Sequence, residues 1–265
     1  MPGVADYALA LSDEELARYR FLAESAAAEE AGDWERAGVV SGARIVDVGC
    51  GPGAVLARLA AVVGPAGRAV GVDRDPVAVG HARRAVAGLP QASVGVGAAD
   101  ATGLRPGWAD VAMCRHVLAH NTGRERAIVD HLAGLVRPGG AVYLVDVDMT
   151  CQRFMPLDPD LDLFERYLEF QVRQGNDLSV GMRLGSLLED AGLAVERFRC
   201  AGPVLRFPAG SRPPHWAARE AMRAAGMADD ADIARWGAAL DRMDALDPRP
   251  WIFTPILIAV GRLPG

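Results

Sequence analysis

The stretch VDVGCGPG, residues 46–53, places three glycines at alternate positions directly after a short apolar run. Such a run followed by glycines is typical of a buried strand that turns tightly into a helix, with the backbone open to a ligand. The segment AVLARLAAVV, residues 54–63, continues with helical periodicity, in agreement with this interpretation. One acidic residue, Asp47, lies inside the apolar run, where a tight turn alone does not require it.

The chain repeats this unit of strand and helix. Apolar runs at 69–73, 109–114 and 141–147 predict further strands, and periodic segments between them predict helices. Repeats of this kind predict a doubly wound α/β fold with a mostly parallel sheet and helices on both faces. Ligands of such sheets bind at the carboxyl ends of the strands, where the glycines of the first turn lie.

Capping signals mark the start of two of these helices. Asp75 followed by Pro76 predicts one start, because the carboxylate accepts a backbone N–H and proline is tolerated at the first helical position. Thr122 with Glu125 three residues later predicts a capping box at the start of the other.

Composition limits the choice of partners. The 265 residues include 28 basic and 34 acidic ones, and the net charge of -6 gives no general attraction to nucleic acid or to an anionic membrane. Every basic residue is an arginine, so the sequence excludes a Schiff-base lysine and a lysine general base. The 4 cysteines form no C-x-x-C pair, and no apolar stretch reaches the length of a membrane span. We expect a cytoplasmic protein that binds a small molecule without nucleic acid, metal or membrane partners, and a homodimer is compatible with the sequence.

Two carboxylates distinguish the ligands that the glycine loop could bind. Residues 49–54, GCGPGA, satisfy the dinucleotide pattern G-x-G-x-x-G/A, and Asp73 follows the last glycine by about 20 residues. That pattern alone is weakly specific. Asp47 would repel a pyrophosphate, whereas it would suit a positively charged ligand. S-adenosylmethionine has a sulfonium, an amino group and no phosphate, so it fits both acids better than a nicotinamide dinucleotide does.

The motifs taken together resemble those of the class I S-adenosylmethionine-dependent methyltransferases, in the branch that acts on small molecules. The resemblance covers about residues 40–150 in the family's order and, more weakly, RLGSLLEDAGLAVERF and IFTPILIAVGR near the C-terminus. It implies a Rossmann-like, seven-stranded sheet, S-adenosylmethionine as the cofactor and methyl transfer as the reaction. The matching segments are VDVGCGPG for the first motif, GVDRD for the second strand and its acid, AAD for the adenine-contacting segment, ADVAMCRHVLAH for the fourth strand with its loop, and LVRPGGAVYLVDVD for the passage into the fifth strand.

The resemblance implies one set of cofactor-binding residues. In this set the glycines approach the methionine moiety and the ribose, Asp47 receives the amino group, and Asp73 accepts both ribose hydroxyls. Asp100, with the Ala101 amide, is expected to contact the adenine edge, and a turn-forming role before Gly103 is the alternative for this acid. The full set is Asp47, Gly49, Gly51, Gly53, Asp73, Arg74, Asp100, Ala101 and Arg115.

Two histidines follow the fourth predicted strand and are the catalytic candidates. Methyl transfer is a displacement at an activated carbon, so alignment is the main requirement, and a base helps where the acceptor is a hydroxyl. We expect His116 to point toward the transferred methyl group and to act as this base. His120 lies about one helical turn further on, and packing of the loop is its alternative role.

Segments outside the common core are expected to bind the acceptor. Phe154, Tyr167 and Trp216 are the candidate contacts for an apolar or aromatic acceptor, with core packing as the alternative. The string D-x-D-x-D at 158–162 is interpreted as acids at a helix N-terminus and not as a metal site. The predicted organisation is an N-terminal helical cap (1–40), the cofactor-binding core (41–150), a helical lid insertion (151–180), the core continued (181–202), a helical substrate segment (203–250) and a final core strand (251–265).

Three functions are compatible with these observations. The leading one is methyl transfer to oxygen, nitrogen or carbon of a small, natural-product-like molecule. A nicotinamide-dependent oxidoreductase is the second, although Asp47 and the absence of lysine argue against it. The third is a protein that binds S-adenosylmethionine for a structural purpose or for another reaction, which the fold alone does not exclude.

Overall fold

A seven-stranded sheet forms the centre of the protein in a computed structural model that describes residues 13–210 and 212–265. The strand order is β3-β2-β1-β4-β5-β10-β7, and β10 runs antiparallel to both of its neighbours. The predicted doubly wound, mostly parallel sheet is therefore confirmed. Its order reverses between β1 and β4, the position at which such sheets bind ligands. The strands are β1 (Arg44–Val48), β2 (Arg68–Asp73), β3 (Ala92–Val96), β4 (Ala109–Arg115), β5 (Val136–Val147), β7 (Ala194–Cys200) and β10 (Ile256–Arg262).

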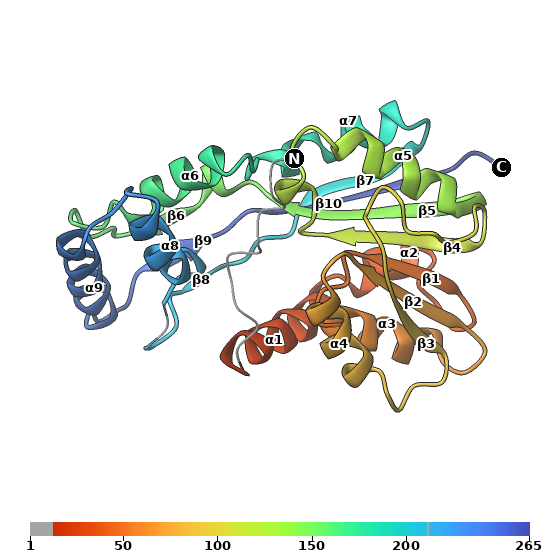
Figure 1. The fold of residues 1–265 in the computed structure, drawn as a ribbon, viewed down its shortest axis with the longest axis horizontal. Helices are drawn as coiled ribbons and strands as arrows, with labels where there is room; N and C mark the ends of the chain where they lie inside the picture. Colours follow the sequence, from red (N-terminus) through yellow and green to blue (C-terminus); the bar gives the residue numbers. More distant parts are fainter. Residues whose placement is uncertain (1–12, 211) are drawn as a thin grey trace.

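Helices cover both faces of this sheet (Figure 1). Side chains of β1 alternate between the faces, so that Val46 packs toward α5 and α7, whereas Ile45 packs toward α2 and α3. By the same alternation Asp47 lies on the face of α2 and α3. Among the described residues, no helix is long and apolar enough to cross a membrane. The covering helices are α1 (Asp13–Glu29), α2 (Ala31–Ala37), α3 (Ala54–Val63) and α4 (Pro76–Ala85) on one side, and α5 (Glu125–Leu135) and α7 (Leu184–Asp190) on the other.

One of the two capping predictions is confirmed and the other is wrong. The Asp75 carboxylate accepts the Val77 N–H at 2.8 Å, and Pro76 is the first residue of α4. Helix α5 instead starts at Glu125 after Arg124, with no side-chain cap. The Glu125 carboxylate accepts a hydrogen bond from Arg183 at 2.8 Å. Glu125 therefore forms a tertiary ion pair and not the hydrogen bond of a capping box.

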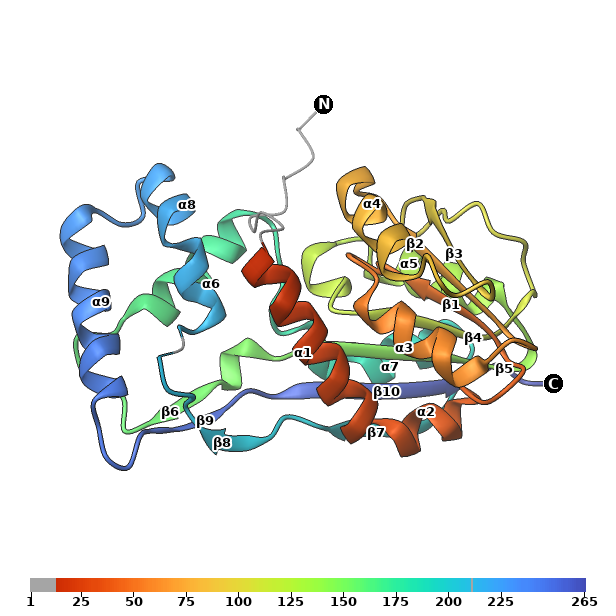
Figure 2. The ribbon, with the colours of Figure 1, turned by 90° about the horizontal axis from the view of Figure 1, so that it is seen from below.

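A helical lobe, residues 153–173 and 204–253, lies beyond the carboxyl ends of the parallel strands (Figures 1 and 2). Strand β5 leads into β6 (Arg153–Met155), β7 leads into β8 (Val204–Arg206), and β9 (Trp251–Phe253) leads into β10. The three short strands form a second antiparallel sheet in the order β6-β9-β8. The lobe thus continues the strands β5, β10 and β7 of the main sheet beyond the ends of these strands.

An apolar cluster holds the lobe together. Phe154 from β6, Phe170 from α6, Phe207 after β8 and Trp236 from α9 are buried in it. The helices that supply the cluster are α6 (Leu163–Arg173), the short η4 (Pro214–Ala218), α8 (Arg219–Ala224) and α9 (Asp230–Asp244).

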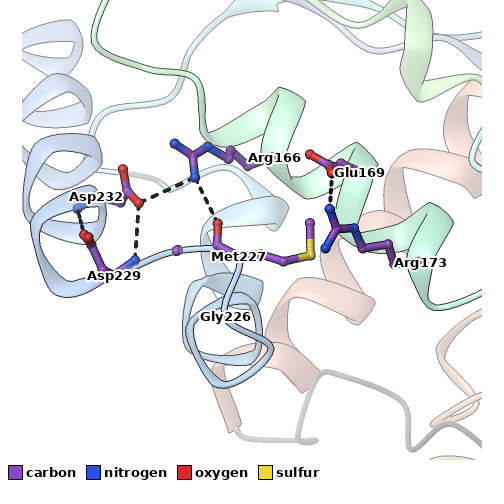
Figure 3. A pocket seen from close by; sticks show the side chains of 8 residues that line it. Arg166, Glu169, Arg173, Gly226, Met227, Asp229 and Asp232 are labelled. Carbon is purple, nitrogen blue, oxygen red and sulfur yellow. Dashed lines mark hydrogen bonds and ion pairs between the residues drawn. The ribbon is translucent and has the colours of Figure 1, made fainter.

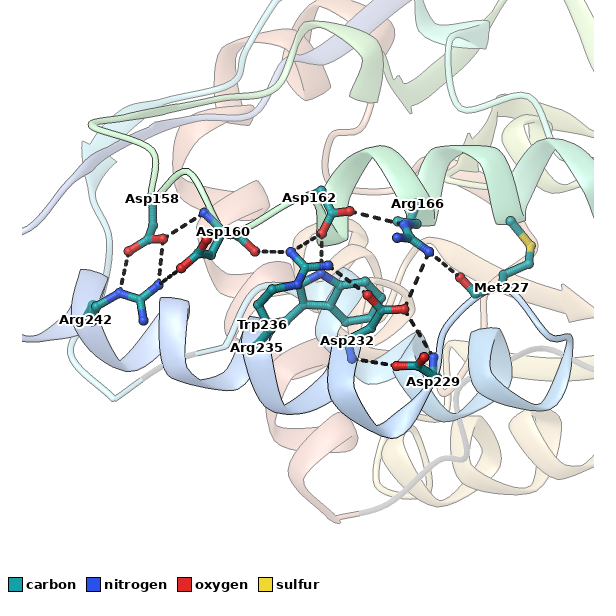
Figure 4. A network of polar contacts seen from close by, with 10 residues as sticks. All are labelled: Asp158, Asp160, Asp162, Arg166, Met227, Asp229, Asp232, Arg235, Trp236 and Arg242. Atoms are coloured by element: carbon teal, nitrogen blue, oxygen red, sulfur yellow. Dashed lines mark hydrogen bonds and ion pairs between the residues drawn. The ribbon is translucent and has the colours of Figure 1, made fainter.

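The D-x-D-x-D acids bind arginines of α9 (Figure 4). Asp158 and Asp160 accept hydrogen bonds from Arg242, at 2.8 Å from Nε and 2.7 Å from Nη2 respectively. Asp162 occupies the N-cap position of α6, yet its side chain caps nothing and accepts the Trp236 indole N–H at 2.5 Å. The acids thus precede the start of α6, as the sequence predicts, and their carboxylates in addition fix the loop before α6 onto α9.

Candidate cofactor and acceptor site

The loop after β1 owes its shape to three glycines with left-handed backbone. A Cβ atom on Gly49 would lie 2.2 Å from the Val117 side chain, and one on Gly53 would lie 2.7 Å from Ala82 of α4. The packing of the protein itself therefore requires glycine at both positions. A Cβ on Gly51 would meet nothing within 4 Å, so this glycine leaves the loop backbone open to a ligand.

Asp73, the last residue of β2, holds the glycine loop. One of its carboxylate oxygens accepts the Gly51 N–H at 2.8 Å, and the other accepts the Asp75 N–H at 2.9 Å. A carboxylate oxygen has room for a second hydrogen bond, so this arrangement is compatible with ribose hydroxyls as additional donors. The ribose contact stays a prediction, and the attachment of the loop to β2 is a role that sequence reasoning missed.

Asp47 is a buried carboxylate with an unpaired oxygen. It lies in β1 opposite Gly71 of β2 and Met113 of β4, and it is 2% exposed. Its Oδ2 atom has no hydrogen-bond partner. Burial raises the pKa of this carboxyl from 3.8 to about 7, although the charge of Arg115 opposes the rise. An unpaired carboxylate oxygen beside the glycine loop suits the cationic part of a ligand.

Arg115, at the end of β4, is held by the N-terminal helices. Its guanidinium donates hydrogen bonds of 2.5 and 2.9 Å to Glu30, which lies between α1 and α2. Glu30 also accepts the Tyr143 hydroxyl at 2.8 Å and the Trp34 indole N–H at 3.3 Å. This network anchors α2 beneath the site. The contact of Arg115 with the cofactor stays a prediction, and sequence reasoning missed Glu30.

Asp100 has a protein partner at the edge of the predicted adenine site. The Arg124 side chain forms an ion pair with it, and this hydrogen bonding lowers the pKa of the carboxyl. Ala101, which pairs with Ala98 in an isolated bridge, and Arg74 after β2 are both exposed. The predicted adenine contacts of these residues stay predictions.

His116 has strained backbone geometry. Its φ is 55°, which makes it the one non-glycine residue with left-handed backbone in the described part of the chain. The side chain is exposed, and its backbone N–H donates to the Val145 carbonyl at 2.8 Å. Such strain persists where the surrounding structure imposes it and is concentrated at functional sites.

His120 lies in the short η1 helix (Leu118–His120). Burial and the charge of Arg74 lower the pKa of its imidazole, and a hydrogen bond with Asn176 opposes this. The Asp146 carboxylate at the end of β5 accepts the Ala119 N–H at 3.2 Å and so fixes this turn. His120 is therefore tied to the loop after α6 through Asn176.

Two of the predicted acceptor residues, Phe154 and Tyr167, surround a histidine that sequence reasoning did not single out. The ring of His215 in η4 lies 6.2 Å from Phe154, 5.2 Å from Phe164 and 5.9 Å from Tyr167, between ring centroids. His215 is 0% exposed, and neither of its ring nitrogens has a hydrogen-bond partner. Burial lowers the pKa of this imidazole to about 3.

Trp216 is partly buried and packs against the same apolar cluster. Its ring tip lies 3.4 Å from the position of a Cβ on Gly237 of α9, and the Arg219 guanidinium lies 4.6 Å from its ring centroid. The contacts of these aromatic side chains with an acceptor stay predictions, because each of them also has a packing role.

A hollow of about 440 Å³ lies between α6 and the connection from α8 to α9 (Figure 3). Its charged side chains pair with one another, Arg166 with Asp232 and Arg173 with Glu169. None of its lining residues belongs to the carboxyl ends of the strands. In the described ranges no group of three or more histidine, cysteine or acidic side chains is placed to hold a metal ion.

The site agrees with what a comparison with known protein families finds. It combines a glycine loop, an acid at the end of β2 and a buried acid in β1. Residues 45–140 match the family model described as a methyltransferase domain. This part of the chain is therefore similar to the methyltransferase domain of class I S-adenosylmethionine-dependent methyltransferases. The match favours methyl transfer over a nicotinamide-dependent oxidoreductase among the three functions compatible with the sequence.

The chain also resembles individual curated proteins over part of their length. An uncharacterized 37.1 kDa protein from a transposon of Streptomyces fradiae is 33% identical over 159 residues, which are 58% of this chain and 44% of that protein. A ubiquinone biosynthesis O-methyltransferase of Xylella fastidiosa is 29% identical over 158 residues, 59% of this chain and 63% of the relative. The chain therefore spans between 44% and 63% of the length of these curated relatives.

A solved structure supports the fold over most of the chain. It is that of a proposed methyltransferase of Bacillus halodurans, with a TM-score of 0.59 and 20% identity. The match covers 89% of this chain and 98% of the other.

The residues present fit S-adenosylmethionine, the cofactor of this family. The unpaired Oδ2 of Asp47 suits its positively charged methionine end. The open space beside Gly51 admits the ligand to the loop backbone. The carboxylate of Asp73, at the end of the neighbouring strand, offers acceptors for sugar hydroxyls.

Proposed function

We propose that this chain transfers the methyl group of S-adenosylmethionine to a small, natural-product-like acceptor with an apolar or aromatic body. The observation that carries the proposal is the buried, unpaired carboxylate oxygen of Asp47 beside the glycine loop. An unpaired buried polar atom is costly, and a cationic ligand would remove the cost. The family match adds that proteins with this core use such a ligand for methyl transfer.

The chain's own residues position the two reactants in this proposal. Bound S-adenosylmethionine supplies a methyl carbon that is already activated by the sulfonium. Asp47, once ionised, binds the amino group, and Gly51 and Asp73 hold the sugar end. The enzyme then has to align the acceptor with the methyl carbon and exclude water.

His116 is the proposed general base when the acceptor is a hydroxyl. Its backbone is pinned to β5 through Val145, while its side chain is exposed directly after β4. A histidine at this position is able to accept the proton that the hydroxyl loses during transfer. An oxygen acceptor agrees with the name of the relative from Xylella fastidiosa, an O-methyltransferase.

The helical lobe is the proposed acceptor-binding element. Its sheet continues β5, β10 and β7 beyond the strand ends, and its core consists of aromatic and aliphatic side chains. Tyr167 packs against both this cluster and the core on the α5 side of the main sheet. An apolar acceptor held by the lobe would therefore lie next to the strand ends at which the cofactor is expected.

Two measurements test the proposed function. Titration calorimetry should show binding of S-adenosylmethionine and S-adenosylhomocysteine, with no detectable binding of NAD or NADP. A mass-spectrometric screen of hydroxylated aromatic metabolites should then show the gain of one methyl group. Binding of the cofactor with no transfer to any acceptor would favour a protein that uses it for another purpose, and a preference for NAD would refute the assignment.

A further inference from the structure

His215 is a fully buried polar side chain for which the protein supplies no partner. It lies in η4 within the apolar cluster of the helical lobe, and both Nδ1 and Nε2 lack a hydrogen bond. The side chains in ring contact with it are Phe154, Phe164 and Tyr167. Buried polar groups in native proteins are nearly always paired, so an unpaired one calls for an explanation.

Packing does not explain an imidazole at this position. A phenylalanine ring would fill the same aromatic surroundings without desolvating two polar nitrogens. Other histidines with buried surface have partners, since His131 contacts the Thr102 hydroxyl at 2.8 Å and His120 bonds to Asn176. The unpaired state of His215 is thus not a general property of histidines in this chain.

We propose that His215 is a recognition residue for the acceptor, which binds a neutral hydroxyl of an aromatic molecule through a hydrogen bond from or to the imidazole. The inference rests on the proposed function, because it assigns the binding point of the substrate class named there. A neutral imidazole has one donor and one acceptor nitrogen, and a hydroxyl is complementary to either. A carboxylate or a phosphate would instead favour a protonated ring, which burial opposes by lowering the pKa of His215 to about 3.

The position of His215 is compatible with access from the junction between lobe and core. Phe164 and Tyr167 lie three residues apart on α6, both are half-buried, and both contact the imidazole. Rotation of these two side chains would therefore open a path to the ring. Tyr167 also packs against the main core, so His215 is separated by one side chain from the side of the lobe that faces the sheet.

Three probes with the same ring system test this recognition. They are 2-naphthol, which has a neutral hydroxyl, naphthalene, which has no polar group, and 2-naphthoate, which is anionic. In fluorescence titrations of the protein saturated with S-adenosylhomocysteine, the wild type should bind 2-naphthol at least about 10-fold more tightly than either other probe, as expected for one buried hydrogen bond.

Two substitutions isolate the imidazole. H215F removes both nitrogens and keeps an aromatic ring, and it should reduce the preference for 2-naphthol over naphthalene to less than about 2-fold. H215Q keeps an amide donor and acceptor and should retain part of the preference. H81F, a replacement in α4, is the matched control and should leave all three affinities unchanged. The affinity for S-adenosylhomocysteine should stay the same in every variant.

The outcomes separate this inference from the proposed function. Equal binding of 2-naphthol and naphthalene by the wild type, or an unchanged preference in H215F, would overturn the role of His215. Failure of the wild type to bind S-adenosylhomocysteine would instead overturn the proposed function. If H215F does not fold, the imidazole ¹⁵N chemical shifts of His215 in the wild type decide the question, because they should move when 2-naphthol is added and unchanged shifts would refute the contact.

Discussion

Replacement of Asp47 by asparagine should change how the stability of the cofactor-free protein depends on pH. Burial raises the pKa of Asp47 from 3.8 to about 7, with Arg115 opposing and Asp73 adding to the rise. Because the folded protein holds this proton more tightly than the unfolded chain does, the protonated carboxyl favours folding. Its contribution is fully present below pH 3.8 and is lost as the pH rises toward about 7.

The magnitude follows from the two pKa values. At about 1.4 kcal/mol per pKa unit, the interval from 3.8 to about 7 corresponds to about 4 kcal/mol. Between pH 5 and pH 8 the wild type should lose about 3 kcal/mol of its free energy of unfolding through this group alone. Asparagine does not ionise, so D47N should lack this loss. Burial also raises the pKa of Asp146 to about 7. Both proteins contain Asp146, so its contribution cancels when their changes in the free energy of unfolding are compared.

Urea unfolding of both proteins at pH 5 and pH 8, without cofactor, measures the effect. Calorimetric titration with S-adenosylmethionine is the second measurement. The wild type should bind this ligand more tightly at pH 8 than at pH 6, because the ionised carboxylate is the form that attracts a cation. D47N should bind weakly at both values. Equal losses of stability in the two proteins between pH 5 and pH 8 would refute the buried, protonated state of Asp47.

Three further predictions concern the loop and the histidines. In calorimetry, D73A should weaken S-adenosylmethionine binding by about 10-fold or more, because two charge-assisted hydrogen bonds to the ligand and the hydrogen bond to the Gly51 N–H are lost together. An unchanged dissociation constant would remove Asp73 from the site. Thermal unfolding should show G53A to be less stable than G51A, because the added Cβ meets α4 at 2.7 Å in the first and open space in the second; equal melting temperatures would contradict this. On a hydroxyl acceptor, H116A should lower kcat by about 10²-fold while H120A mainly lowers the melting temperature; a kcat for H116A within about twofold of wild type would dismiss His116 as the base.

The sheet was predictable because its signals are local. Strands β1, β2 and β5 contain short apolar runs, and a glycine or an acid lies at or directly after the carboxyl end of each, so neighbouring residues carry the information. Asp75 caps its own helix two residues away, and this prediction held. The Thr122 capping box failed because Glu125 binds Arg183, a residue 58 positions further along the chain.

The candidate site was predictable only in part for the same reason. The glycine loop, Asp47 and Asp73 lie within a few residues of strand ends, whereas Glu30 reaches Arg115 across 85 positions and Tyr143 across 113. The periodicity of apolar residues along the sequence contains no signal for pairs that are so far apart in the chain. His215 has no sequence signal either, because an unpaired buried nitrogen is a property of its packed surroundings. The acids at 158–162 precede a helix as predicted, but the sequence contains no signal for their partners Trp236 and Arg242 on α9.

The way in which the lobe is joined to the sheet limits how it could be moved or transplanted. The chain passes between the two parts four times, at 148–152, 174–179, 201–203 and 254–255, and strands lie on both sides of three of these crossings. No single proteolytic cut would release the lobe, and no single pivot would swing it. A protein engineer who wished to give this core another acceptor specificity would have to splice the chain at four places, so redesign of side chains inside the existing lobe is the more practical route.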